Sequence, residues 1–336
     1  ISTQNSCERC FSMKPFESFL SPQLNEFIAY RENLGYETKR RRALLLAFDR
    51  YLKDKGADWS CFEPSFFLRM RTELGKQPAH TNQILMTARV FFRFLMRLGY
   101  VEENPLQDVP LLKESATIPF LFSREQTNQL LAALCKRIRR QEKHFLTDLG
   151  TYLVLLLLAR CGMRISEPLG LMVRHYRRDD RTLYIENTKF RKDRLIPIPK
   201  AVATEIDNYL RVRKHLKPDD QNPYLLAGKK NRALGESRVR STFHRAVEDL
   251  GLKQQRKTVG NMIFSPPVPH GLRHSFAVNT LRNIIERKGS AQNALPVLAT
   301  YLGHTTYICS SVYLKIADAK RRNNLYDFTI WQEWKI

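Results

Sequence analysis

Four short stretches of this sequence carry side chains that could act together on a phosphate group. The stretch 159–171 (ARCGMRISEPLGL) places an arginine after an apolar run, and 188–198 (TKFRKDRLIPI) offers lysines. The stretch 269–281 (PHGLRHSFAVNTL) holds a histidine and an arginine three residues apart, and 298–316 (LATYLGHTTYICSSVYLKI) holds a histidine followed nine residues later by a tyrosine. The candidate catalytic residues are Arg164, Lys189, His270, Arg273, His304 and Tyr313, with Lys192 as the rival lysine.

These residue types suit phosphoryl transfer at a phosphodiester. An arginine stays charged and grips two phosphate oxygens with its planar fork, so two arginines could stabilise a five-coordinate phosphorane. Lysine and histidine can protonate a departing alkoxide, and tyrosine can attack phosphorus to leave a covalent phosphoester. No P-loop, zincin helix or paired-carboxylate motif stands beside them in the sequence. Taken singly, each residue also fits a structural role: a surface arginine, a solvated lysine, a structural HxxR pair or a packed histidine.

The set as a whole resembles the tyrosine recombinase (phage-integrase) family, which includes the Xer recombinases and the lambda-type integrases. The motifs follow the family's order: G-M-R-I-S-E at 162–167, T-K at 188–189, H-G-L-R-H at 270–274, L-G-H at 302–304 and then the tyrosine. Each motif is common by chance, whereas five in this order and spacing are not. Two features depart from the family: Pro168 stands where leucine is usual, and the stretch 253–269 is long.

The resemblance implies how a scissile phosphate would be held. Arg164 and Arg273 match the two family arginines that clamp it, and His304 matches the histidine that hydrogen-bonds it in the transition state. His270 matches a residue that serves as a general base or as a phosphate ligand. Glu167 matches a family carboxylate beside the first arginine, and we expect it to support the site without taking part in the chemistry.

The resemblance also implies a covalent mechanism. Tyr313 matches the nucleophile that forms a 3′-phosphotyrosine, and Lys189 matches the hairpin lysine that protonates the leaving 5′-hydroxyl. We therefore expect a site-specific DNA recombinase or integrase that uses neither metal, cofactor nor ATP, in the integration, excision or transposition of mobile DNA. A non-catalytic DNA-binding regulator with the same fold and a type IB topoisomerase-like DNA-relaxing enzyme are the alternatives.

The elements that would position this chemistry begin with a predicted helical core-binding domain at residues 21–105. Residues 1–20 form an N-terminal extension, and residues 106–120, with two prolines, form a linker. Four apolar-periodic segments of the core-binding domain each end at a glycine, which is a typical helix stop signal. These glycines are Gly35, Gly56, Gly75 and Gly99.

A larger catalytic domain with a C-terminal tail is predicted over residues 121–336. It is mainly α-helical with a small β-sheet, since 182–186 and 194–199 are strand-like runs joined by a basic connection. The stretch 253–269 is predicted to be a loop. Family analogy would close the two domains around DNA as a C-shaped clamp.

Helix boundaries in the catalytic domain can be predicted from local signals. Ser123 and Gln126 form a capping box for its first helix, and the run 152–159 (YLVLLLLA) is a buried helix. Ser166 is predicted to cap the helix that follows Arg164.

The charge balance indicates a polyanionic partner. Lys+Arg 56 against Asp+Glu 33 give a net charge of +23 and a pI of about 10.0, which attracts nucleic acid. An acidic membrane surface is the weaker option, because the sequence shows no polybasic tail or lipidation signal. A basic run is often only a solvated face, but the total charge favours phosphate contact. The candidate DNA-binding residues are Lys39, Arg40, Arg41, Arg42, Arg89, Arg93, Arg97, Lys192 and His274.

Cysteine usage and the absence of a signal peptide favour a reduced, cytoplasmic, DNA-associated protein. The six cysteines are scattered, and Cys7 and Cys10 form a lone CxxC without two further ligands at zinc-finger spacing. No metal site is therefore predicted.

Family analogy further implies a homotetramer on two double-stranded DNA sites, formed through C-terminal tail exchange. The tail carries Phe328, Trp331 and Trp334 in a helical rhythm. It could dock on a neighbouring protomer or pack on its own domain, and the sequence leaves both open.

Overall fold

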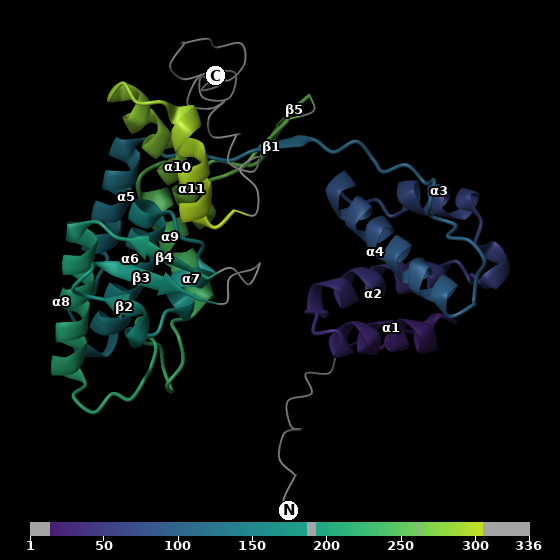
Figure 1. The fold of residues 1–336 in the computed structure, drawn as a ribbon, viewed down its shortest axis with the longest axis horizontal. Coiled ribbons are helices and arrows are strands. Elements are labelled where there is room, and N and C mark those ends of the chain that lie inside the picture. Colours follow the sequence, from purple (N-terminus) through teal and green to yellow (C-terminus); the bar gives the residue numbers. More distant parts are fainter. Residues whose placement is uncertain (1–13, 187–192, 261, 305–336) are drawn as a thin grey trace, which may run out of the picture. The chain divides into compact units, whose positions relative to one another are not determined.

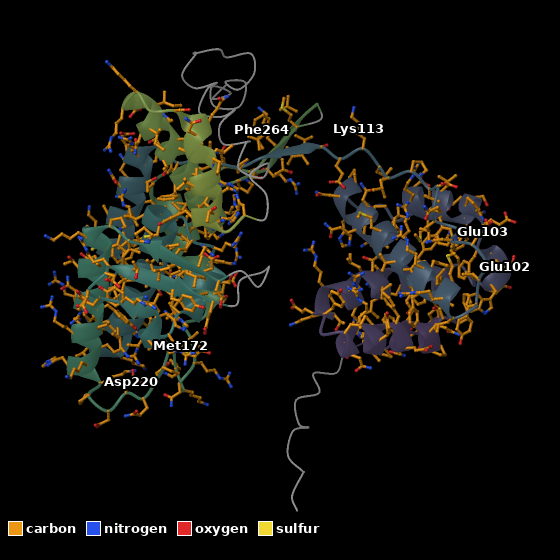
Figure 2. The ribbon with its side chains drawn as sticks, viewed as in Figure 1. Glu102, Glu103, Lys113, Met172, Asp220 and Phe264 are labelled. Carbon is orange, nitrogen blue, oxygen red and sulfur yellow. The ribbon has the colours of Figure 1, made fainter. Side chains whose placement is uncertain are left out.

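A computed structural model of the 336-residue chain describes residues 14–186, 193–260 and 262–304. The chain divides into two compact units, residues 1–116 and residues 117–336. Each unit has a hydrophobic core of its own. Figure 1 shows the elements of both units, and Figure 2 shows the side chains of the described residues.

In its described residues the first unit is helical. Its elements are α1 (Ser21–Asn33), α2 (Lys39–Asp54), the 3-10 turn η1 (Trp59–Cys61), α3 (Pro64–Glu73) and α4 (Pro78–Arg97). The four predicted glycine stops are confirmed, because each glycine adopts a positive φ after its helix: Gly35 at 75°, Gly56 at 57°, Gly75 at 57° and Gly99 at 77°. Phenylalanines fill the core, with Phe27 packed edge to face on Phe91 and Phe67 on Phe92.

The described residues of the second unit are mainly helical, with two small sheets, and this confirms the predicted fold class. The elements are β1 (Ala116–Ile118), α5 (Arg124–Lys136), α6 (Glu142–Cys161), α7 (Ser166–Gly170), η2 (Val173–His175), β2 (Tyr176–Arg177), β3 (Thr182–Ile185), β4 (Arg194–Pro197), α8 (Lys200–Leu216), α9 (Glu236–Asp249), β5 (Lys257–Val259), β6 (Met262–Phe264), α10 (Pro269–Glu286) and α11 (Ala291–Leu302).

The apolar helix α6 is the centre of the second unit. It contacts α5, α8, α9 and α10, and it buries the whole run 153–159. The prediction of a buried helix here is confirmed. By length and composition alone α6 could also cross a membrane, but most of it is buried inside the unit, as in the core helix of a globular protein. Packing on every side explains why its apolar residues do not keep to one face.

The predicted hairpin is present and belongs to an antiparallel sheet of order β2-β3-β4. In its register Thr182 faces Pro197, and Ile185 faces Arg194 at the end of the pair. Leu183 and Ile196 point into the core, because the side chains of a strand alternate between its two faces. The hairpin thus places Arg194 where the chain returns from 187–192, which lie outside the described residues.

The second sheet corrects two expectations. The stretch 253–269 is not simply a loop, because β5 and β6 form a hairpin there, with Gly260 at a φ of 57° in the turn. β1, which lies in the predicted linker 106–120, adds to this hairpin in the order β1-β6-β5. Three-residue strands leave too short an alternation to be recognised from the sequence. They form because a neighbouring strand supplies hydrogen-bond partners.

Of the two helix-capping predictions, one is confirmed and one is wrong. The capping box at α5 is confirmed, since the Ser123 hydroxyl accepts from the Gln126 N–H and the Gln126 side chain accepts from the Ser123 N–H. The predicted cap by Ser166 is wrong: Ile165 is the N-cap residue of α7, and it makes no side-chain capping bond. Instead the Glu167 carboxylate accepts from the backbone N–H of Arg164.

Candidate active site

Arg164 is held rigidly in the turn between α6 and α7. The turn starts at Gly162, which has a left-handed φ of 59°. A Cβ added at this position would lie 2.4 Å from the Phe276 ring, so the close packing also requires glycine. The Arg164 guanidinium donates from Nη1 to Glu167 Oε1 at 2.9 Å and from Nη2 to the Gly303 carbonyl at 2.8 Å. With its side chain 19% exposed, Arg164 still reaches the surface.

Arg273 lies beside it on α10 and is almost completely buried. Its Nη1 donates to the Gly162 carbonyl at 2.8 Å, and its Nη2 donates to the Leu302 carbonyl at 2.6 Å. These carbonyls end α6 and α11, so one guanidinium joins the two helix ends. Together with Arg164, it concentrates positive charge at one place in the fold.

Glu167 balances part of that charge. Its Oε2 lies 2.9 Å from Arg194 Nη2 and 4.0 Å from Arg273 Nη1. Burial by itself would raise the pKa of this carboxyl. The hydrogen bond and charge of Arg194, the Arg164 backbone N–H and the charge of Arg273 instead hold it below its ordinary value of 4.5. Glu167 is therefore an anion that orients arginines.

Three histidines border the arginines. His270 and His274 lie one helical turn apart on α10 with ring centroids 4.6 Å apart, and His304 follows α11. The pKa values of His270 and His304 are both lowered to about 4. Burial is the main cause, and the charges of Arg273 and Arg164 come next. The pKa of His274 is lowered to about 3, mainly by burial and then by the charges of His270 and Arg273. All three are neutral at pH 7, so each can donate one hydrogen bond and accept another.

This cluster predicts a loss of stability in mild acid. Between the folded-state pKa values near 4 and the ordinary value of 6.5, the unfolded chain binds more protons than the folded protein. Stability therefore falls as the pH decreases through that window. We expect thermal melts to show Tm falling from pH 6.5 to about 4, with a shallower fall in His274→Gln. His80→Asn, at an exposed site on α4, is the control; a Tm independent of pH would contradict the prediction.

The end of α11 brings His304 to the arginines. Gly303 caps the helix with φ 67° and ψ 46°, and the His304 N–H donates to the Ala299 carbonyl at 2.9 Å. An added Cβ at Gly303 would lie 2.9 Å from Arg194 Nη1. The glycine of L-G-H is thus required by its left-handed conformation and by its close contact with a buried guanidinium.

Gly303→Ala is expected to cost more than the left-handed strain alone, which is about 1–2 kcal/mol. Gly251→Ala is a matched control, because Gly251 has a φ of 65° and nothing within 4 Å of the added Cβ. Urea unfolding should show the larger loss in Gly303→Ala. Equal losses in the two variants would mean that the contact with Arg194 is unimportant.

The structure brings together six of the predicted site residues: Arg164, Glu167, His270, Arg273, His274 and His304. Lys189, Lys192 and Tyr313 lie outside the described residues, as do Cys7, Cys10 and the C-terminal tail. Among the residues described, no group of three His, Cys, Asp or Glu side chains could hold a metal ion.

The predicted DNA-binding residues of the first unit differ in their surroundings. Lys39, Arg40, Arg41 and Arg42 form the first turn of α2, and Arg93 is exposed on α4. Arg89 instead donates to the carbonyls of Leu106 and Val109 at 2.9 and 2.8 Å, so it ties α4 to the following segment. The Arg97 guanidinium lies over the Tyr30 ring, with its Cζ 5.6 Å from the ring centroid.

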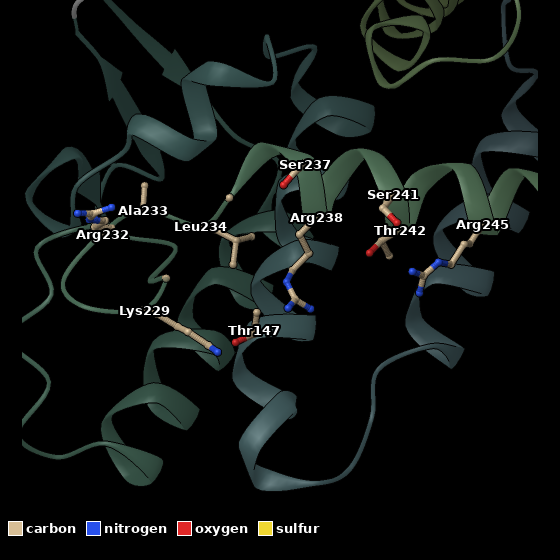
Figure 3. Close-up of a pocket in the computed structure, with 12 residues that line it drawn as sticks. Thr147, Lys229, Arg232, Ala233, Leu234, Ser237, Arg238, Ser241, Thr242 and Arg245 are labelled. Atoms are coloured by element: carbon tan, nitrogen blue, oxygen red, sulfur yellow. The ribbon is translucent and has the colours of Figure 1, made fainter. Parts of the chain in front are cut away.

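Two features of the second unit were missed by the sequence analysis. Arg194, with 9% of its side chain exposed, bonds to Glu167 and donates to the Tyr301 carbonyl at 2.9 Å. In the sequence it is one basic residue among several, so nothing distinguished it. The second feature is a basic groove of about 660 Å³ along α9, lined by Thr147, Lys229, Arg232, Ser237, Arg238 and Arg245 among others (Figure 3).

Comparison with known protein families assigns the chain. The model of the phage integrase family matches residues 121–320, which include every residue of the cluster. The chain belongs to this family. It is a tyrosine site-specific recombinase, and the predicted resemblance is confirmed.

Individual relatives agree with this assignment. The recombinase is 30% identical over 254 residues to the tyrosine recombinase XerC of Alcanivorax borkumensis, covering 75% of this chain and 74% of XerC. Its fold is similar to that of XerH bound to a palindromic difH substrate after cleavage, with a TM-score of 0.67 at 18% identity over 93% of this chain and 85% of XerH. A lambda integrase tetramer bound to a Holliday junction gives a TM-score of 0.60 at 17% identity over 89% of this chain and 83% of the integrase.

Proposed function

We propose that this recombinase holds the scissile phosphate of double-stranded DNA at Arg164 and Arg273 and cleaves the strand with Tyr313. The observation that carries the proposal is the pair of guanidinium groups joined to the same helix end. Arg164 bonds to the carbonyl of Gly303, and Arg273 bonds to that of Leu302, the preceding residue. Two forks held this way are preorganised for an anion, so little rearrangement is needed when charge develops on the phosphorane.

The proposed reaction conserves the energy of the phosphodiester. The Tyr313 oxygen attacks phosphorus as the bond to the 5′-oxygen breaks, and Lys189 gives that oxygen a proton. His270 accepts the phenolic proton, and His304 hydrogen-bonds the phosphate. A 5′-hydroxyl of the partner duplex then attacks the 3′-phosphotyrosine, and the same transfers run in reverse. Because His270 is neutral at pH 7, it can accept a proton once the phosphorane offsets the nearby positive charge.

Covalent capture tests this chemistry. The protein is incubated with sheared DNA from its own genetic neighbourhood and denatured in detergent, and the protein-linked fragments are sequenced. Adducts that share one sequence and vanish in Tyr313→Phe are expected. Adducts that persist in Tyr313→Phe would assign the nucleophile to another tyrosine, and binding without any adduct would favour the non-catalytic regulator. Relaxation of supercoils without a second site would favour the topoisomerase-like alternative.

We further propose that the basic groove along α9 contacts the DNA backbone. Lys229, Arg232 and Arg245 make no ion pair with any described residue. Arg238 lies 3.7 Å from Asp148, and Lys229 and Arg238 reach toward Thr147 from two sides of the groove (Figure 3). Phosphate oxygens would accept from these cations and from the hydroxyls of Ser237 and Ser241, which requires no particular base sequence.

Replacing groove cations is expected to reduce the salt dependence of DNA binding. Each lost phosphate contact should lower the slope of log K against log salt by about 1, so Arg232→Ala/Arg245→Ala should lower it by about 2. The measurement is fluorescence anisotropy with a random-sequence duplex. Arg137→Ala is the control, because Arg137 already forms a bidentate pair with Asp249. An unchanged slope in the double variant would remove the groove from the DNA contact surface.

For assembly we propose four protomers on two DNA sites, joined through their C-terminal tails. The family assignment and the lambda integrase tetramer support this proposal. Deletion of residues 326–336 should leave binding to a single site intact and impair the synapsis of two sites, measured by gel shift and light scattering. Unchanged assembly would contradict the exchange of tails.

A further inference from the structure

Arg194 is a buried charge that the proposed chemistry does not use. Its side chain is 9% exposed, and its guanidinium pairs with Glu167 Oε2 at 2.9 Å and donates from Nε to the Tyr301 carbonyl at 2.9 Å. Its Nη1 is buried without a hydrogen-bond partner among the described residues and packs against Gly303. A buried N–H without a partner costs free energy, so stability alone does not account for an arginine here.

The contacts of Arg194 join three parts of the site. Arg194 begins β4, Glu167 lies on α7, and Tyr301 lies in the last turn of α11. Glu167 Oε2 accepts both from Arg194 and from the backbone N–H of Arg164, while Oε1 accepts from the Arg164 guanidinium. Arg194 is thus the donor that ties the Glu167 carboxylate, already bonded to Arg164, to β4 and the end of α11.

The positive charge of Arg194 keeps the Glu167 carboxylate from pairing fully with Arg273. Glu167 Oε2 lies 4.0 Å from Arg273 Nη1, at the limit of an ion pair. If Arg194 were absent, Oε2 would keep the Arg164 N–H but lose its charged partner. The carboxylate could then turn toward Arg273 and form a full pair with it, because a buried anion is stabilised by a nearby cation. A guanidinium paired in this way is less free to bind a phosphate. With Arg194 present, one carboxylate is shared among three arginines, and a net positive charge remains for the substrate.

We infer that Arg194 is a positioning residue, which fixes Glu167 and the last turn of α11 so that Arg164 and Arg273 face the scissile phosphate. The inference rests on the proposed function of the two arginines as the phosphate clamp. It assigns Arg194 no direct contact with DNA.

A double-mutant cycle tests the inference, with single-turnover cleavage of a duplex bearing the sequence recovered by covalent capture. Arg194→Met is expected to slow cleavage by about 30-fold, less than the loss of a direct phosphate ligand. Arg194→Met/Glu167→Gln should be no slower than Glu167→Gln, because Arg194 acts on the two clamp arginines through this carboxylate. Multiplied losses in the double variant would overturn the inference, and so would full activity of Arg194→Met.

A second substrate separates positioning from a general structural defect. A methylphosphonate at the scissile position replaces one charged oxygen by a methyl group, so its phosphorane needs less positive charge from the clamp. On this substrate Arg194→Met should cleave no more than about 3-fold more slowly than the unmodified protein. A defect of the same size on both substrates would overturn the inference. Arg178→Met is the matched control, since Arg178 pairs with Asp207 of α8 at 2.9 Å.

Two further variants make every outcome informative. Arg194→Lys keeps the charge but cannot span Glu167 and the Tyr301 carbonyl, so it should show the same pattern if Arg194→Met does not fold. Arg164→Ala reports on the proposed function itself. If methylphosphonate restores neither Arg164→Ala nor Arg194→Met, the clamp assignment is wrong. If it restores only Arg164→Ala, the clamp stands and the inference about Arg194 fails.

Discussion

Arg273→Ala is expected to lower the rate of strand cleavage by about 10³-fold, the loss typical when a preorganised charged donor is removed. The side chain is 1% exposed and joins the carbonyls of Gly162 and Leu302, so alanine would remove the charge and also leave two buried acceptors without a donor. Single-turnover cleavage with purified protein measures the effect.

Arg273→Lys serves as the control for charge. Lysine keeps one positive charge but lacks the fork that reaches two carbonyls, so cleavage should stay severely reduced while DNA affinity changes little. Thermal melts of each variant separate lost catalysis from lost folding. Cleavage near the original rate in a well-folded Arg273→Ala would exclude this residue from the phosphate clamp.

Glu167→Ala is expected to destabilise the fold by about 3–5 kcal/mol, the cost of breaking a buried pair by removing one partner. Its carboxylate has 5% of its surface exposed and lies within ion-pairing distance of Arg164, Arg194 and Arg273. Without it, three guanidinium groups repel one another at the ends of α6 and α11. Urea unfolding at pH 7 gives the size of the loss, and cleavage should fall with it.

The pH dependence identifies the charge of Glu167 as the cause. The pKa of Glu167 is held below 4.5 in the folded protein. Its contribution to stability is therefore complete above pH 4.5 and is lost as the pH falls through the folded-state pKa. The difference in stability between the unmodified protein and Glu167→Gln should therefore shrink in acid. A difference that stays constant with pH would assign the effect to shape and hydrogen bonding.

Some parts of the fold could be predicted because short segments encode them. The four glycines that end the first four α-helices adopt the left-handed conformation that their sequence pattern predicts. The capping box at Ser123 and the strands at 182–185 and 194–197 follow from contacts between near neighbours. In contrast, β1, β5 and β6 were missed, because each has three residues and depends on a partner strand.

Within the site, the sequence determined which residue types are available, and their order along the chain was enough to predict the tyrosine recombinase family. The sequence could not show that Arg164 reaches the Gly303 carbonyl, 139 positions away, or that Arg273 reaches that of Gly162, 111 positions away. Only the tertiary structure decided that Arg194, one basic residue among many, is buried against Glu167 and the end of α11. The physical reason is that burial and ion pairing depend on which segments pack together, and no local pattern records that packing.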